Sequence, residues 1–138
     1  MNSKSRGLRN NNPGNIRRSP TKYLGEVAGK DKAFKCFSDV SWGYRAMFVL
    51  LHTYQRRYGL NTITGLIRRW APETENDTAA YIGAVSSRSG ISPTEYVNTL
   101  YPDTMIAIVA AMSAVENGAE ADMAQVREGW RLFEKHKP

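Results

Sequence analysis

The residues best suited to chemistry lie near the start of the chain, in the string Arg6-Gly7-Leu8-Arg9-Asn10-Asn11-Asn12-Pro13-Gly14-Asn15-Ile16-Arg17-Arg18. Because Asn tolerates left-handed dihedrals and its amide bonds nearby backbone, the string predicts a rigid loop, not a strand or a helix. Amides suit the hydroxyl and acetamido groups of sugars, and guanidinium groups suit anions. The side chains we predict to bind substrate are Arg6, Asn11, Asn12, Asn15 and Arg17. Alternatively, the asparagines satisfy only their own loop backbone.

A second informative segment runs from Trp70 to Tyr81 and places three carboxylates between two aromatic residues. Pyranose faces pack on aromatic rings, and carboxylates accept hydrogen bonds from sugar hydroxyls, so this composition suits a carbohydrate cleft. The predicted binding residues here are Trp70, Glu75, Asp77 and Tyr81. In the alternative interpretation, Asp77 only caps a helix and the two aromatic residues belong to the core.

These strings occur in an order that resembles a group of phage and prophage proteins. R-G-L-R-N-N-N-P-G-N-I-R is followed by Y-L-G-E, then by F-K-C-F-S-D with G-Y-R-A, then by the segment that begins at Trp70. The resemblance spans about residues 6–98, and the proteins that it covers are labelled virion structural or lysozyme-like proteins. It implies a lysozyme-like helical fold and a role at the bacterial cell wall.

Part of the pattern is also similar to bacterial cell-wall N-acetylglucosaminidases, in which an asparagine-rich loop lies beside the cleft. The stretch 11–17 resembles that loop. In those enzymes the catalytic glutamate comes from a helix ahead of the loop, whereas the ten residues ahead of it here include no acid. If the activity is kept, we expect its acid to come from elsewhere in the chain.

Glycoside cleavage needs a carboxylic acid in an apolar setting, usually with a second carboxylate as nucleophile or base. Lytic transglycosylases, by resemblance, manage with one glutamate and the sugar's own hydroxyl. We predict Glu26 as the catalytic acid, because it follows Tyr23-Leu24-Gly25. Asp39 is its expected partner, and Glu75 or Asp77 are the alternatives that could approach across the groove. The alternative for Glu26 is a solvated surface charge, and Arg45 is expected to pair with Glu26 or Asp39 as a structural clamp.

The elements that must position these residues are mostly helices. Turn residues and aromatic runs predict a hairpin from strands 23–27 and 33–37. Apolar spacing and caps predict helices over 41–59, 62–70, 77–90, 103–117 and 120–135, with a short one opening at 92–95. Tyr54 and Tyr58 are expected in the core. The predicted fold is mainly α (α+β), one lysozyme-like domain over 1–138, with a loop-rich head at 1–41 and a helical body at 42–138.

The bulk composition excludes several functions. The 138 residues are 41% hydrophobic and 23% charged, and no stretch approaches the ~20 apolar residues of a membrane span. With one cysteine and two histidines, we expect no metal and no cofactor. The net charge of +6 attracts polyanions, but the arginine pairs are isolated and no recognition motif accompanies them, so nucleic acid is ranked last as a partner.

The sequence therefore predicts a phage- or prophage-derived peptidoglycan glycosidase or lytic transglycosylase. The alternative is a noncatalytic virion structural or wall-binding protein with the same fold. Expected partners are peptidoglycan glycan strands and other virion proteins. The start of the chain lacks the apolar segment of a signal peptide, so we expect synthesis in the bacterial cytoplasm and delivery in the virion or release at lysis.

Overall fold

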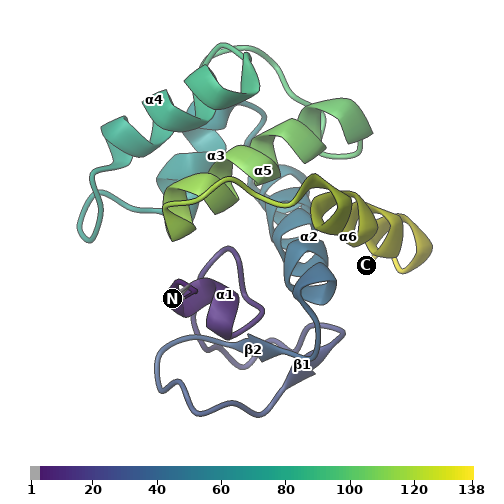
Figure 1. Ribbon diagram of the computed structural model, residues 1–138. Coiled ribbons are helices and arrows are strands. Elements are labelled where there is room, and N and C mark those ends of the chain that lie inside the picture. Colours follow the sequence, from purple (N-terminus) through teal and green to yellow (C-terminus); the bar gives the residue numbers. More distant parts are fainter. Residues whose placement is uncertain (1–3) are drawn as a thin grey trace.

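The computed structural model describes residues 4–138 and is mainly helical, with a small antiparallel hairpin near the N-terminus (Figure 1). Its elements, in chain order, are α1 (Arg6–Arg9), β1 (Glu26–Val27), β2 (Cys36–Phe37), α2 (Val40–Tyr58), α3 (Ile63–Trp70), α4 (Thr78–Ser89), α5 (Pro102–Asn117) and α6 (Met123–Lys135). The predicted fold class, mainly helical with an N-terminal hairpin, is confirmed.

The N-terminal part differs in detail from the prediction. Residues 6–9, expected as loop, form one helical turn because the Ser5 side chain accepts a hydrogen bond from the Leu8 amide. The hairpin is shorter than predicted, with Glu26 opposite Phe37 and Val27 opposite Cys36. In Figure 1 this part, which we call the head (residues 4–39), lies below the helices.

Most helices begin at a side-chain N-cap or end at a left-handed glycine. Thr62 caps α3 and Asp77 caps α4, as predicted, and glycines in left-handed conformation follow α2 and α4. The predicted cap of α2 at Ser41 is wrong. Asp39 takes that place, because its carboxylate accepts a hydrogen bond from the Ser41 amide at 3.0 Å.

The short helix predicted to open at 92–95 is also wrong. The segment forms a turn, and the Pro93 carbonyl accepts hydrogen bonds from the Thr64 amide at 3.1 Å and the Thr64 hydroxyl at 2.9 Å. The Val97 amide donates to the carbonyl of Asn61 at 2.8 Å. Backbone groups that would bond to one another within a helix instead form hydrogen bonds with residues at the start of α3 and just before it.

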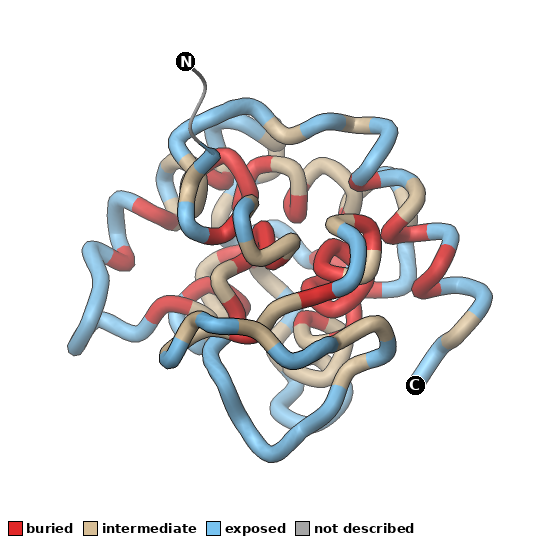
Figure 2. The backbone as a smooth tube through the Cα atoms, turned by 60° about the horizontal axis from the view of Figure 1, so that its bottom comes forward, coloured by how far each residue is buried: buried red, intermediate tan, exposed pale blue. Residues whose placement is uncertain are grey.

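The core lies between the five long helices α2 to α6. Met105, Ile108, Val109 and Met112 of α5 are all buried, as its nearly continuous apolar sequence predicts. Figure 2 shows the buried segments in the middle of the molecule and the exposed connections around them. Among the helices of residues 4–138, none has the length and apolar character needed to cross a bilayer.

Candidate functional site

Three side chains from distant parts of the chain donate hydrogen bonds to one carboxylate, that of Glu116. The Asn15 amide reaches Oε1 at 2.9 Å, while the Trp70 indole N–H and the Tyr81 hydroxyl reach Oε2 at 3.2 and 2.8 Å. The head and the segment from Trp70 to Tyr81, which the sequence singled out separately, therefore meet at this group.

Each member is positioned by local structure. Glu116 lies in the last turn of α5, Trp70 ends α3, and Tyr81 lies in the first turn of α4. Asn15 has a left-handed backbone with φ of 49°, which Asn tolerates better than most residues. Beside it Gly14 permits close packing, since a Cβ atom there would lie 2.8 Å from the Trp70 ring.

A pocket of about 500 Å³ opens beside the carboxylate. The head and the helical body both line it, and its lining residues include Asn15, Arg17, Arg69, Trp70, Glu75 and Glu116. Trp70 and Glu116 are half-buried. We call this the acidic pocket after its two carboxylates, Glu75 and Glu116, which it holds together with Arg17 and Arg69. An aromatic ring, two carboxylates and amides on one concave surface can bind sugar rings and their hydroxyl groups.

The electrostatics of Glu116 differ from those of Glu75. Glu75 forms an ion pair with Arg17 at 3.3 Å, and both side chains are more than half exposed. Glu116 forms no ion pair with any residue in 4–138 and has only neutral donors around it. Burial, then the nearby Glu116 charge and the hydrogen bond to it, raise the pKa of Tyr81 well above its ordinary value. The Tyr81 hydroxyl therefore stays protonated and keeps donating.

Other predicted binding residues of the head are engaged inside it. Arg6 forms a two-point ion pair with Asp31 at 2.6 and 2.7 Å. Asn12 is fully buried, and its amide group bonds backbone atoms of Ile16 and Lys35. Asn11 donates to the Phe37 carbonyl at 3.0 Å. These contacts fit the alternative interpretation, in which the asparagines satisfy nearby backbone.

Glu26, predicted as the acid, lies outside the acidic pocket. Both of its carboxylate oxygens are 3.0 Å from the ammonium of Lys35, whose side chain has no exposed surface. Its Oε1 also accepts a hydrogen bond from the Tyr23 amide at 3.2 Å. A lysine buried to this degree needs a partner charge, so this contact gives Glu26 a structural role.

The remaining predicted acids serve as helix caps. Asp39 caps α2, and hydrogen bonds from the Ser41 hydroxyl and amide lower its pKa. Asp77 caps α4 through the Ala80 amide at 3.1 Å and lines a separate depression. The clamp expected for Arg45 is wrong, because Arg45 forms no ion pair with Glu26 or Asp39.

The core position expected for Tyr58 is wrong, since it is 49% exposed, whereas Tyr54 is half-buried and packs against the core. The Arg69 guanidinium lies 3.7 Å from the Tyr58 ring centroid and 5.4 Å from that of Tyr54. The stacked guanidinium keeps the Tyr58 ring at the surface, because the charged end of an arginine resists burial.

Glu116 was missed by the sequence analysis. One feature of the sequence indicated it: Glu116 is an acid near the C-terminal end of the most apolar helix, where a negative charge is unfavourable unless other residues stabilise it. Asp103, the other acid of α5, lies in the first turn, where the helix dipole favours negative charge. Glu116 lies at the opposite end, where the dipole disfavours it, so only tertiary contacts account for its presence.

Within the part of the chain that the structure describes, no three His, Cys, Asp or Glu side chains come together in a way that could hold a metal ion.

The comparisons with known proteins place the chain among phage proteins. No family model matches it. It is 41% identical over 123 residues to Protein P5 of Pseudoalteromonas phage PM2, an alignment that covers 86% of this chain and 75% of that protein. At this identity and coverage, the chain belongs to the same family as Protein P5.

Proposed function

We propose that this protein cleaves the glycan strands of bacterial peptidoglycan, as a glycosidase or lytic transglycosylase, with Glu116 as its acid. The observation that supports the proposal is the carboxylate of Glu116, held by Asn15, Trp70 and Tyr81 on the wall of a pocket. Glu116 thereby takes the role that the sequence assigned to Glu26. The phage family membership supports action on a bacterial host.

The proposed chemistry follows from the contacts of the two oxygens. Oε2 accepts two hydrogen bonds and Oε1 accepts one, so Oε1 keeps a free position for a proton. In the acid form, Glu116 donates this proton to the leaving glycosidic oxygen as the bond to the anomeric carbon breaks. Either water or the sugar's own hydroxyl then bonds to that carbon, and its proton returns to the Glu116 carboxylate.

A second carboxylate is available for the hydrolytic variant. Glu75 lines the same pocket, and its contact with Arg17 is exposed to solvent. Such a carboxylate activates water or stabilises positive charge at the anomeric carbon. The transglycosylase variant needs only Glu116. Loss of activity in Glu75→Gln would therefore favour hydrolysis, and full activity would favour the transglycosylase reaction.

The test of this function uses purified protein and bacterial sacculi. The wild-type chain should release soluble muropeptides, and Glu116→Gln should lower the rate at least ~10²-fold, because amide nitrogen cannot supply the proton. Glu95→Gln, an exposed acid outside the acidic pocket, is the matched control and should keep the rate. Glu26→Gln also leaves the buried Lys35 without its partner charge, so its rate is measured on protein that circular dichroism shows to be folded. If folded Glu26→Gln stops release and Glu116→Gln does not, the assignment of the acid is reversed.

A noncatalytic wall-binding or virion structural role is the second candidate. The three hydrogen bonds that tie Glu116 to Asn15, Trp70 and Tyr81 would also serve as a purely structural clamp between the head, α3, α4 and α5. This role predicts binding of chitin oligomers without turnover, which titration calorimetry and product analysis distinguish. Under either role we expect association with the virion, or release at lysis, and contact with other virion proteins.

A further inference from the structure

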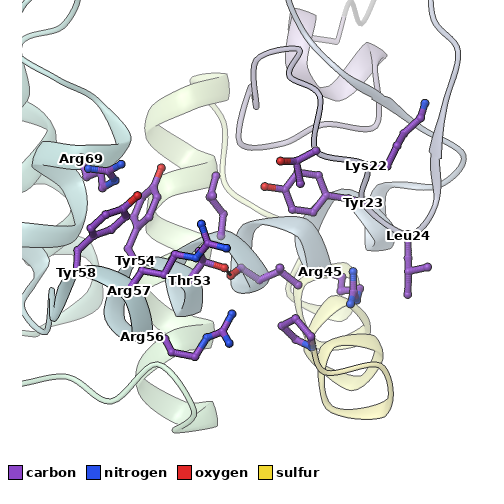
Figure 3. Close-up of a pocket in the computed structure, with 14 residues that line it drawn as sticks. Lys22, Tyr23, Leu24, Arg45, Thr53, Tyr54, Arg56, Arg57, Tyr58 and Arg69 are labelled. Atoms are coloured by element: carbon purple, nitrogen blue, oxygen red, sulfur yellow. Dashed lines mark hydrogen bonds between the residues drawn. The ribbon is translucent and has the colours of Figure 1, made fainter.

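A second pocket of about 560 Å³, which we call the basic pocket, adjoins the acidic pocket (Figure 3). The two share five lining residues: Thr21, Tyr23, Leu50, Tyr54 and Arg69. The two pockets therefore adjoin across these residues, within reach of a single extended ligand. In Figure 3, Tyr54, Tyr58 and Arg69 lie at one end of the basic pocket and Arg45 lies beside Leu24 at the other.

The side chains that line the basic pocket carry charge of one sign. They include five cations and no acid: Lys22, Arg45, Arg56, Arg57 and Arg69. Pro138 lines the pocket as well. None of the five forms an ion pair with any residue in 4–138. Burial raises the pKa of the neighbouring Tyr54 to about 12, with partial offset by Arg69, so its hydroxyl adds no negative charge. Unpaired cations that share a concave surface attract anions strongly.

Arg45 is the most informative of these residues. Its side chain is buried, with 5% of the residue exposed, and its Nε atom has no hydrogen-bond partner. One Nη atom donates to the His136 carbonyl. Burial lowers the pKa of Arg45, which reflects the cost of a desolvated charge. A buried charge without an opposite charge is costly, and an anionic ligand in the basic pocket would remove that cost.

We propose that the basic pocket binds the carboxylates that peptidoglycan carries on its lactyl and peptide substituents, while the glycan itself lies in the acidic pocket. This inference rests on the proposed function. The shared lining of the two pockets favours an anion attached to the same strand, and arginine is the side chain best suited to pair with carboxylate. Neutral glycans such as chitin would leave the five cations unmatched.

The test compares one muropeptide with the same fragment after its carboxyl groups are amidated. Wild-type protein should bind the carboxylate form at least ~10-fold more tightly at low salt, and the preference should shrink as salt screens the charges. The exposed double variant Arg56→Gln/Arg57→Gln should lose most of this preference and keep its affinity for the amidated fragment. Arg127→Gln/Lys135→Gln removes two exposed positive charges of α6 outside the basic pocket and should change neither.

Arg45→Met is an independent test of the preference for the carboxylate form. It should reduce the preference for carboxylate further, and if it fails to fold, the exposed double variant still decides the question. Equal affinity for both fragments in the wild type, with sacculi still cleaved, would overturn this inference and leave the proposed function standing. Failure to bind either fragment and to cleave sacculi would overturn both. Tighter binding to single-stranded DNA than to the muropeptide would assign the cations to nucleic acid instead.

Discussion

Several polar contacts of the head converge on the side chain of Asp31. Its carboxylate pairs with Arg6 and accepts hydrogen bonds from Asn10 and from the amides of Ala33 and Phe34, all between 2.6 and 3.0 Å. Hydrogen bonds, first from Arg6 and then from the Ala33 amide, hold its pKa far below the ordinary range. The shape of the head therefore depends on this acid being ionised.

This contact predicts a pH dependence of stability. A carboxyl whose pKa is lower in the folded state stabilises the fold above its unfolded value of about 3.9, and this contribution is lost as the pH falls toward the folded value. Urea unfolding followed from pH 7 to pH 2.5 should therefore show a shallower loss for Asp31→Asn than for the wild type. Glu95→Gln, an exposed acid that accepts no hydrogen bond within 4–138, should leave the slope unchanged. Identical slopes for all three proteins would contradict the role given to Asp31.

At the scale of elements, the packing of α2 against α6 depends on a close approach of their backbones. A Cβ atom at Gly129 would lie 2.5 Å from Cβ of Tyr44 and 3.0 Å from the Arg45 amide nitrogen. Aromatic residues complete the contact, with the Phe48 and Trp130 rings edge to face at 4.9 Å. Because Arg45 lies on this face of α2, the spacing of the two helices also shapes the basic pocket.

Gly129→Ala should destabilise the protein by about 1–3 kcal/mol, since overpacking forces the helices apart. Gly83→Ala in α4 is a matched control, because a Cβ atom there meets nothing within 4 Å. It should stabilise by about 0.5–1 kcal/mol through helix propensity alone. Denaturant unfolding measures both values. Equal effects of the two substitutions would show that the α2–α6 contact is looser than described.

At the scale of the whole molecule, the head must stay docked on α5 for the acidic pocket to exist. Asn117 makes much of this connection: its amide donates to the Pro13 carbonyl at 2.8 Å, and its oxygen accepts from the Ser5 hydroxyl at 2.6 Å. Glu116 lies in the same turn of α5. A displacement of the head from this turn would therefore also change the surroundings of the proposed acid.

Asn117→Ala should therefore lower muropeptide release ~10²-fold, because a displacement of about 1 Å at a reacting group costs that much. Hydrogen exchange of amides in residues 5–18 should become faster in this variant, while that of α2 and α6 stays slow. Asn61→Ala, an exposed asparagine whose side chain has no hydrogen-bond partner within 4–138, serves as control. Unchanged exchange and release in Asn117→Ala would show that the head docks by other contacts.

The sequence alone determined the features that depend on neighbours along the chain. Apolar spacing and caps such as Thr62, Asp77 and Gly90 set the helices, because capping and periodicity act within a few residues. The phage kinship was likewise readable from the asparagine-rich string and the segment after Trp70. The turn after Ser92 was misjudged because its carbonyls pair with α3, which local sequence does not reveal.

Only the tertiary structure brought Glu116 into the acidic pocket beside Glu75. The partners of Glu116 lie 101, 46 and 35 residues away from it along the chain, so no local pattern joins them. Glu26 was predicted as the acid because of its apolar neighbours in the sequence. In the fold its carboxylate forms an ion pair with the buried ammonium group of Lys35. The chemistry of a carboxyl group is set by the charges and donors around it in space, and sequence spacing does not give those.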